Sequence, residues 1–330
     1  MKIGVLDTDG KFDNEFFTGK KLKIVRDEKW NTNELNDMEF THGEYVCSHI
    51  LKENPTAEII LIPIINSRMK CSVQDLIDGL ELLINYSVDM INLSIGDEYK
   101  NHKELEEICQ KAYNKGILIV AAHSNREVDA TYPAQFPFVL GVSCTDEEDT
   151  TKILNYEVEK NEIIFSSSYF SIYHLGIPKL LPGNSFACAR ITGLLSHHKN
   201  TYRSFLKQFS DTIFNCYYHY PTLKQKRCLF FTNRKNDLLE QRFIKEVTNT
   251  VECVDFLNII RFKDVTPNRW DILYIDHSNY LEILPYKTII KRLAISEKNK
   301  QFVLRFPLYN INERINLYKK NKIIIYQFFI

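Results

Sequence analysis

The sequence lacks paired cysteines, long apolar runs and an excess of charge of either sign. Its eight cysteines stand singly, without a C-x-x-C pair, which in a protein that is not secreted indicates reduced, mostly buried thiols. The longest apolar stretch, residues 59–65, is far short of the ~20 residues of a membrane span. The apolar run before Asp7 is too short for a secretory signal. We therefore expect a cytoplasmic protein with no membrane span.

The charge balance hides an asymmetry between the two parts of the chain. Lys plus Arg equals Asp plus Glu, at 42 each, which argues against a polyanionic partner such as nucleic acid. Residues 201–330 nevertheless hold 22 basic and 12 acidic side chains, against 20 and 30 in residues 1–200. Such a split predicts two domains with a boundary near residue 200. Either the two domains attract each other, or the basic part recruits an acidic peptide.

The first part alternates short apolar strands with helical stretches. Helical spacing predicts helices over residues 43–53, 73–86 and 103–115, and the last helix stops at Gly116. Several strands are apolar without alternation, as strands buried on both faces are. The βαβ rhythm predicts a mostly parallel sheet covered by helices on both faces, a three-layer αβα architecture. The predicted strands are residues 3–7, 23–26, 58–63, 89–94, 117–121, 138–143 and 162–166.

The second part has a different composition. Glycine is absent after Gly193, aromatic residues become frequent, and strand-like runs recur. A helix is possible over residues 240–248, and the charged segment 291–300 is interpreted as a solvated loop. We expect a smaller α+β module over residues 201–330, with strands at 227–232, 269–275, 301–307 and 322–330.

Four short segments contain the residue types needed for nucleophilic catalysis. Asp7 ends the first strand in IGVLDTDG, residues 3–10, and His42 begins a probable helix in THGEYVCS, residues 41–48. Asn125 follows a strand in GILIVAAHSN, and Ser185 opens a helix in PGNSFACARITG. Alone, each residue could be a turn, cap or loop residue. Together and in this order they favour a catalytic set.

At these residues the chain resembles the subtilisin-like serine peptidases, the peptidase S8 family. That family has Asp after the first strand, His in an H-G-x-x-V segment and Ser in a G-[TS]-S-x-A segment, in the order Asp, His, Ser. The segments VDMINLSIG at 88–96, YPA at 132–134 and FVLGV at 138–142 are also similar to the family's pattern. Six such matches over about 190 residues imply a subtilisin-like fold for residues 1–200. The resemblance does not extend past about residue 200.

The resemblance implies a serine endopeptidase that works through an acyl-enzyme. Ser185 would be the nucleophile and His42 its base, with Asp7 holding the ring and stabilising the imidazolium. Asn125 and the backbone N–H of Ser185 would stabilise the oxyanion. The segment Ser94-Ile95-Gly96 would bind an extended peptide as an added strand. The first specificity pocket would be lined by Ala121, Ala122, His123 and Thr131.

Several positions depart from the family's pattern. Asp9 precedes Gly10, Ser124 precedes the oxyanion Asn, and Asn184 stands where Thr is common before the nucleophile. Thr131 replaces a frequent Gly and would make the first pocket shallow. Secreted members carry a signal and a pro-segment, for which Asp7 leaves no room. We therefore expect narrow specificity, such as the maturation of one peptide, with residues 201–330 recognising that substrate.

Other residues and functions remain open. Histidines outside the triad and the cysteines beside it, Cys47 and Cys188, are interpreted as packing or surface residues. No acidic cluster is typical of a calcium loop, so no metal or cofactor is expected. The partner expected is a peptide or protein substrate. A catalytically silent subtilase fold that binds peptides, and an esterase or peptide ligase using the same triad, are the alternatives.

Overall fold

The computed structural model divides the chain into two compact units. Unit 1 comprises residues 1–35, 40–172 and 181–216, and unit 2 comprises residues 36–39, 173–180 and 217–330. The structure describes residues 1–13, 16–30, 41–66, 69–96, 101–126, 130–145, 153–165, 169–174, 177–208, 227–232, 250–255, 271–276, 284–296, 301–304 and 325–327.

Unit 1 is built on an eight-stranded sheet in the order β2-β3-β1-β4-β5-β6-β8-β7, and only the β7–β8 pair is antiparallel. This is the mostly parallel sheet that the sequence predicts. The strands are β1 (Lys2–Thr8), β2 (Lys21–Ile24), β3 (Glu58–Ile65), β4 (Met90–Leu93), β5 (Leu118–Ala122), β6 (Leu140–Cys144), β7 (Ile153–Glu157) and β8 (Glu162–Phe165).

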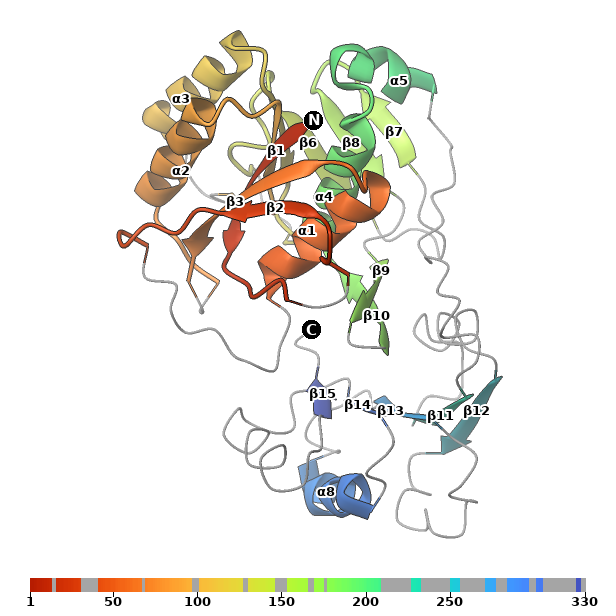
Figure 1. Ribbon diagram of the computed structural model, residues 1–330. Coiled ribbons are helices and arrows are strands. Elements are labelled where there is room, and N and C mark those ends of the chain that lie inside the picture. Colours follow the sequence, from red (N-terminus) through yellow and green to blue (C-terminus); the bar gives the residue numbers. More distant parts are fainter. Residues whose placement is uncertain are drawn as a thin grey trace. The chain divides into compact units, whose positions relative to one another are not determined.

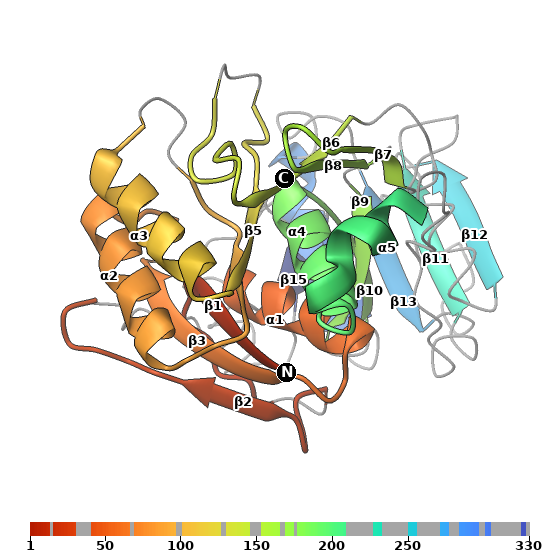
Figure 2. The ribbon, with the colours of Figure 1, turned by 90° about the horizontal axis from the view of Figure 1, so that it is seen from above.

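Helices cover both faces of this sheet (Figures 1 and 2). The helices of unit 1 are α1 (His42–Glu53), α2 (Val73–Asn85), α3 (Lys103–Asn114), α4 (Asn184–Leu195) and α5 (Tyr202–Gln208), with a short 3₁₀ turn η1 (Lys199–Thr201). Helices α2 and α3 lie together on one face and α1 and α4 on the other, as Figure 2 shows. The αβα layering expected from the βαβ rhythm is therefore confirmed.

The side chains of β1 point alternately to the two faces of the sheet, which explains why residues 3–6 of this strand are all nonpolar. Ile3 and Val5 of β1 pack with α1, whereas Leu6 packs with α2 and α3 on the opposite face. Gly4 lies directly beneath α2, because a Cβ there would come within 2.7 Å of the Leu83 side chain. Since successive side chains point to opposite faces, a strand covered on both faces must be apolar at nearly every position.

Two further strands, β9 (Tyr169–His174) and β10 (Ile177–Pro182), form a two-stranded sheet that the sequence analysis did not anticipate. Strand β7 was also not predicted, and the strand expected at 23–26 begins earlier, at Lys21. Within the described residues, no helix combines the length and the apolar character needed to cross a membrane.

Unit 2 contains a five-stranded sheet in the order β12-β11-β13-β14-β15. Each of its four pairings is parallel, a pattern more typical of α/β than of α+β modules. The strands are β11 (Arg227–Thr232), β12 (Thr250–Asp255), β13 (Ile272–Asp276), β14 (Gln301–Leu304) and β15 (Ile325–Gln327). The possible helix at 240–248 lies outside the described residues.

The prediction of a solvated loop at residues 291–300 is wrong for residues 291–296, which the structure describes as helical. The 3₁₀ turn η5 (Leu284–Tyr286) leads into α8 (Lys287–Ser296). Ile290 and Leu293, three residues apart, are buried, whereas Lys291 and Arg292 are exposed. The charges of this segment therefore belong to the solvent face of an amphipathic helix.

Candidate functional site

The predicted catalytic residues lie at one edge of the unit 1 sheet. Asp7 is near the carboxyl end of β1, Ser94 follows β4, and Asn125 lies three residues beyond β5. His42 and Ser185 are in the first turns of α1 and α4, two helices that pack against each other. Carboxyl ends of parallel strands and N-termini of helices thus converge where open α/β sheets place their ligand sites.

Asp7 and His42 form a close pair. His42 Nδ1 lies 2.8 Å from Asp7 Oδ1 and 3.0 Å from Oδ2, and Oδ1 also accepts the backbone N–H of Thr8 at 2.7 Å. Asp7 is fully buried, and the His42 side chain is 18% exposed. A buried carboxylate that accepts the Nδ1 proton fixes the tautomer with Nε2 as the basic atom.

The surroundings of His42 act on its pKa in opposite directions. Burial lowers this pKa, but the negative charge of Asp7 and its hydrogen bond to the ring outweigh the burial. The pKa of His42 is therefore raised above its usual value. A general base with this property is more basic toward a hydroxyl proton, but it needs a higher pH to be free of its own proton.

The start of α1 is fixed by the sequence around His42. Thr41 is the N-cap, and a capping box joins its hydroxyl to Glu44 N and its own N–H to the Glu44 carboxylate at 2.8 Å. Gly43 lies against β1: its N–H donates to Thr8 Oγ1, and a Cβ would come within 2.3 Å of the Thr8 carbonyl. The glycine after the histidine thus lets the helix approach the strand that carries Asp7.

Glu44 extends this local network beyond the helix. Its carboxylate also accepts the N–H of Phe12, which holds the segment after Asp7 against the helix start. Burial raises the pKa of Glu44, while the hydrogen bonds from Thr41 and Phe12 lower it, and the net effect is a rise. Asp9, which the sequence analysis noted as a departure, accepts two hydrogen bonds from Arg26, at 2.7 and 3.0 Å.

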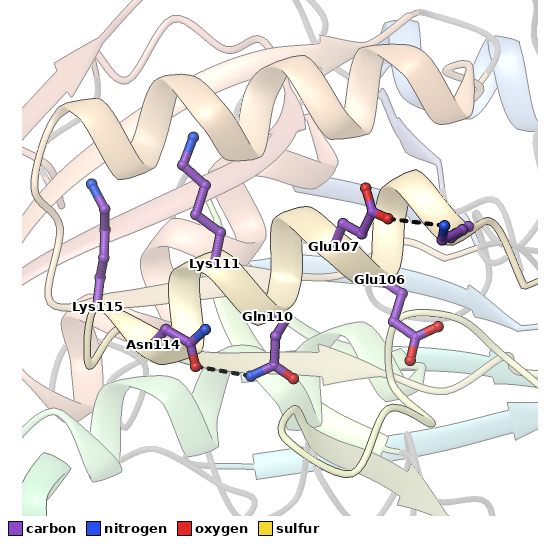
Figure 3. A pocket seen from close by; sticks show the side chains of 7 residues that line it. Glu106, Glu107, Gln110, Lys111, Asn114 and Lys115 are labelled. Atoms are coloured by element: carbon purple, nitrogen blue, oxygen red, sulfur yellow. Dashed lines mark hydrogen bonds and ion pairs between the residues drawn. The ribbon is translucent and has the colours of Figure 1, made fainter.

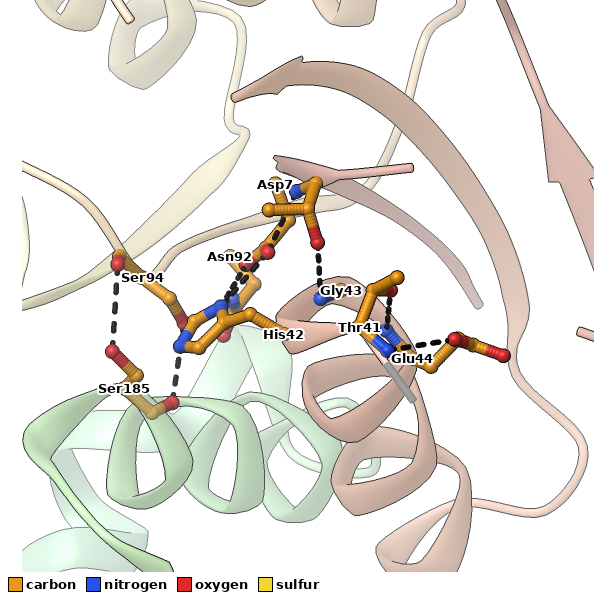
Figure 4. A network of polar contacts seen from close by, with 9 residues as sticks. Asp7, Thr41, His42, Gly43, Glu44, Asn92, Ser94 and Ser185 are labelled. Atoms are coloured by element: carbon orange, nitrogen blue, oxygen red, sulfur yellow. Dashed lines mark hydrogen bonds and ion pairs between the residues drawn. The ribbon is translucent and has the colours of Figure 1, made fainter. Parts of the chain in front are cut away.

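Ser185 lies near His42, and its neighbour Phe186 packs against the His42 ring, with ring centroids 5.4 Å apart. Two hydrogen bonds join Ser185 to Ser94: the Ser185 hydroxyl donates to the Ser94 carbonyl at 3.4 Å, and the Ser94 hydroxyl donates to the Ser185 carbonyl at 3.2 Å. Figure 4 shows these residues together with Asp7 and His42. Figure 4 also shows Ser185 on the side of the His42 ring that faces away from Asp7, where the basic Nε2 would take up its proton.

Asn125 is held next to the start of α4. Its Oδ1 accepts the backbone N–H of Asn184 at 2.8 Å. Its Nδ2 lies 3.7 Å from the position that a Cβ on Gly183 would occupy. Gly183 has a φ of 141° and a ψ of 141°, a conformation that residues with a side chain rarely adopt. The donor end of Asn125 thus lies near the backbone that precedes Ser185.

The segment predicted to bind an extended peptide is partly accessible. Ser94, Ile95 and Gly96 are all half-buried. A Cβ on Gly96 would come within 2.6 Å of the Tyr132 carbonyl and 2.8 Å of Thr131 Cγ2. The glycine therefore permits close contact between this segment and the loop that carries Thr131.

The residues predicted to line the first specificity pocket differ in exposure. Thr131 is buried, and its Oγ1 accepts the N–H of Ser124 at 3.0 Å. Ala121 is fully buried and Ala122 is 5% exposed, on opposite faces of the sheet. Only His123 among these four is half-buried. The segments 94–96 and 121–124 are the two walls of the proposed pocket. Thr131 lies against the first wall at Gly96 and accepts a hydrogen bond from the second at Ser124.

His123 belongs to a second histidine–carboxylate pair. Its Nε2 lies 3.5 Å from Glu162 Oε1, which also accepts the Ser143 hydroxyl at 2.8 Å. The two side chains are 20% and 18% exposed. Burial lowers the pKa of His123, and the charge of Glu162 opposes that change without reversing it.

The cysteines beside the triad are buried, as packing residues are. Cys47 and Cys188 have no exposed surface, and the Cys188 thiol lies 3.4 Å from the Val120 carbonyl. Burial raises the pKa of both thiols, so they stay protonated and poorly nucleophilic. Within the described residues, no group of three or more His, Cys, Asp or Glu side chains could hold a metal ion.

A hollow of about 640 Å³ runs along α3 and shares no residue with this site. Figure 3 shows that its lining side chains come from this helix and from Lys115, which directly follows it. They carry both charge signs and pair among themselves, as in the Lys103–Glu107 ion pair at 3.5 Å. The hollow is therefore a charged helix surface rather than part of the predicted site.

Comparison with known proteins identifies relatives of unit 1. The profile of the Subtilase family, Peptidase_S8, matches residues 1–212. The minor extracellular protease Epr of Bacillus subtilis (strain 168) is 29% identical over 137 residues, which are 38% of this chain and 21% of Epr. Subtilisin DY of Bacillus licheniformis is 24% identical over 211 residues, 58% of this chain and 74% of that protein.

Other relatives are matched over part of their length. Subtilisin Savinase of Lederbergia lenta is 23% identical over 177 residues, 51% of this chain and 63% of Savinase. The chain thus spans 21% of Epr and 63% of Savinase, less than two thirds of either protein.

Two solved structures share the fold at low identity. The prenylagaramide maturation protease PagA is 23% identical, with a TM-score of 0.48, over 62% of this chain and 77% of that one. A cold adapted subtilisin-like serine proteinase is 19% identical, with a TM-score of 0.46, over 61% of this chain and 76% of that one.

Proposed function

The chain belongs to the subtilase family, and from that premise we propose that it is a serine endopeptidase. Ser185 is the proposed nucleophile, His42 the general base and later the acid, and Asp7 the group that orients the ring. Asn125 and the Ser185 backbone N–H are the proposed oxyanion donors. The observation that supports this most strongly is the Asp7–His42 pair, with a fully buried carboxylate 2.8 and 3.0 Å from Nδ1.

The chemistry proceeds by acyl transfer. The Ser185 hydroxyl transfers its proton to His42 Nε2 and attacks the substrate carbonyl carbon. The resulting imidazolium is stabilised by Asp7, and the oxyanion by Asn125 Nδ2. His42 then protonates the leaving amine, and the C–N bond breaks to give the acyl-enzyme. Water activated by the same His42 cleaves the ester and regenerates Ser185.

The proposed substrate is a peptide bound in extended form along Ser94–Gly96. Such a strand would also offer its own N–H groups to carbonyls like that of Ser94, which now accepts the Ser185 hydroxyl. Thr131 supports a preference for a small side chain before the cleaved bond, because it contacts both walls of the proposed pocket. His123 is the proposed side wall, with Ala121 and Ala122 supporting it from the core. Narrow specificity is therefore part of the proposal.

The role proposed for residues 201–330 rests on their charge. With 22 basic and 12 acidic side chains, this part of the chain could attract an acidic segment of the substrate. A reducing compartment, the cytoplasm, is proposed from the cysteines, because Cys47, Cys71, Cys109 and Cys188 form no disulfide. The proposed partner is thus a peptide or protein, and no nucleic acid or cofactor is proposed.

The second candidate function is a catalytically silent peptide-binding protein. It is favoured by one observation, the hydrogen bond at 3.4 Å from the Ser185 hydroxyl to the Ser94 carbonyl, which competes with proton transfer to His42. If that hydrogen bond persists when a peptide is bound, the fold would bind its ligand without cleaving it.

A fluorophosphonate probe separates the two functions. The proposed peptidase is labelled at Ser185, and the label is lost in Ser185→Ala. Mass spectrometry of peptides cut by the wild type but not by Ser185→Ala then gives the substrate and the cleaved bond. A folded wild-type protein that takes up no label would support the binding protein. Broad degradation of casein would retain the peptidase but overturn narrow specificity.

A further inference from the structure

We infer that Asn184 is a positioning residue that sets the oxyanion donor Asn125 in place, an inference that rests on the proposed function. Asn184 is 5% exposed and directly precedes Ser185. It makes three hydrogen bonds to the segment 123–125. Its backbone N–H donates to Asn125 Oδ1 at 2.8 Å, and its Nδ2 donates to the carbonyls of His123 and Ser124 at 3.1 and 2.9 Å.

These contacts join two parts of the chain that are about sixty positions apart in sequence. Residues 123–125 form irregular backbone after β5, so β-sheet pairing does not fix the carbonyls of His123 and Ser124. The Asn184 amide offers two N–H donors, one for each carbonyl, which Thr or Ser could not do with a single hydroxyl. The residue before the nucleophile therefore fixes the backbone on which the oxyanion donor stands.

The backbone bond of Asn184 then fixes the orientation of the Asn125 amide. Because Oδ1 accepts the Asn184 N–H, the oxygen and nitrogen of the Asn125 amide cannot exchange places, and Nδ2 is held on the Gly183 side, 3.7 Å from where a Cβ on Gly183 would be. A donor that is correctly aimed before the reaction contributes more to the transition state than one that must reorient. Asn184 touches no reacting atom, so its effect on catalysis must pass through Asn125.

The test compares Asn184→Asp with a matched control, Asn161→Asp. Aspartate keeps the shape of the side chain but replaces the two donors with an oxygen that faces two carbonyls. Asn161 is also buried, and its Nδ2 donates to the Val139 carbonyl at 3.0 Å, outside the proposed site. Both variants lose one buried amide donor group. Circular dichroism and thermal unfolding measure their folding, and hydrolysis of p-nitrophenyl acetate, which needs no large pocket, gives kcat and KM.

We expect Asn184→Asp to lower kcat at least about tenfold, since small misplacements of catalytic groups are costly, with KM changed less than about threefold. Asn161→Asp should leave kcat within about twofold while lowering the unfolding temperature. In an Asn125→Ala background, Asn184→Asp should change kcat less than about twofold, because the group it positions is gone. Should Asn184→Asp not fold, Asn184→Ser takes its place in both backgrounds.

Two results would overturn the inference alone: an Asn184 variant with wild-type kcat, or the same loss of kcat in both backgrounds. The second result would mean a structural role that does not pass through Asn125. A wild type without Ser185-dependent hydrolysis would instead overturn the proposed function and the inference together, so the two failures are distinguishable.

Discussion

Two histidine–carboxylate pairs lie at the same edge of the unit 1 sheet, and they differ in the burial of the carboxylate, the distance to the ring and the pKa of the histidine. In the Asp7–His42 pair the carboxylate is fully buried and 2.8 Å from the ring, and the pKa of the histidine is raised. In the Glu162–His123 pair both side chains are partly exposed, the distance is 3.5 Å, and the histidine pKa is lowered. Residue types alone would not separate the two pairs, whereas burial and distance do.

The difference indicates separate roles for the two regions. A short, buried hydrogen bond holds the His42 ring and stabilises its charged form, as a general base requires. The longer contact of His123 beside the Thr131 loop fits a wall of the binding site rather than a base. The following predictions test this division of roles, beginning with the largest expected effect.

Asp7→Asn should lower kcat by about 10⁴-fold, because the amide would favour the wrong tautomer of His42 while keeping the geometry of the pair. Hydrolysis of p-nitrophenyl acetate at pH 8, with KM measured in parallel, gives the effect. A loss of less than tenfold would mean that Asp7 does not orient the base, and the comparison between the two pairs would lose its basis.

Thr131→Gly should change selectivity instead of the chemical step. It removes a methyl that touches Gly96 and a hydroxyl that binds Ser124, so the proposed pocket would deepen. We expect kcat/KM for peptide esters with a phenylalanine acyl group to rise about tenfold relative to those with alanine. The glycine should also cost about 1 kcal/mol of stability through its backbone entropy, measured by chemical denaturation. An unchanged ratio of the two esters would place the pocket elsewhere.

Glu162→Gln should have the smallest effect, less than about threefold on kcat and on kcat/KM. The substitution removes the carboxylate charge that raises the pKa of His123. This pKa therefore falls further, and the ring stays neutral in the assay. The assay conditions are those used for Asp7→Asn, which makes the two carboxylates directly comparable. A loss approaching that of Asp7→Asn would show that His123, too, takes part in the chemistry.

The sequence predicted structure best where the physical reason for a residue type is local, such as a nonpolar strand or a glycine that avoids a clash. Apolar runs predicted the strands of the unit 1 sheet except β7, and βαβ spacing predicted the helices on both sides. The glycine after His42 belongs to a motif whose reason is steric, since a Cβ there would meet the Thr8 carbonyl at 2.3 Å. Asp7, His42, Asn125 and Ser185 were recognisable because each lies near the end of a strand or in the first turn of a helix, in a known order.

What the sequence could not give depends on contacts between distant residues. Asn184 stood out only as a departure from Thr, and its three hydrogen bonds to residues 123–125 need the folded chain. The burial of Ala121 and Thr131 and the Glu162–His123 contact are likewise tertiary. In unit 2, α8 was missed because its charged residues were interpreted as a solvated loop. The buried face of this helix is marked by Ile290 and Leu293, whose burial is seen only in the folded chain.

The central claim, that His42 held by Asp7 activates Ser185, is tested most directly by the pH dependence of fluorophosphonate labelling. Only neutral His42 can accept the serine proton, and its folded-state pKa is raised. The second-order labelling rate should therefore rise with pH and level off above a midpoint that lies higher than the usual histidine value of about 6.5. In Asp7→Asn, both the midpoint pH and the plateau value of the labelling rate should fall. A labelling rate that is independent of pH, or a wild-type midpoint below about 6.5 that Asp7→Asn leaves unchanged, would contradict the account.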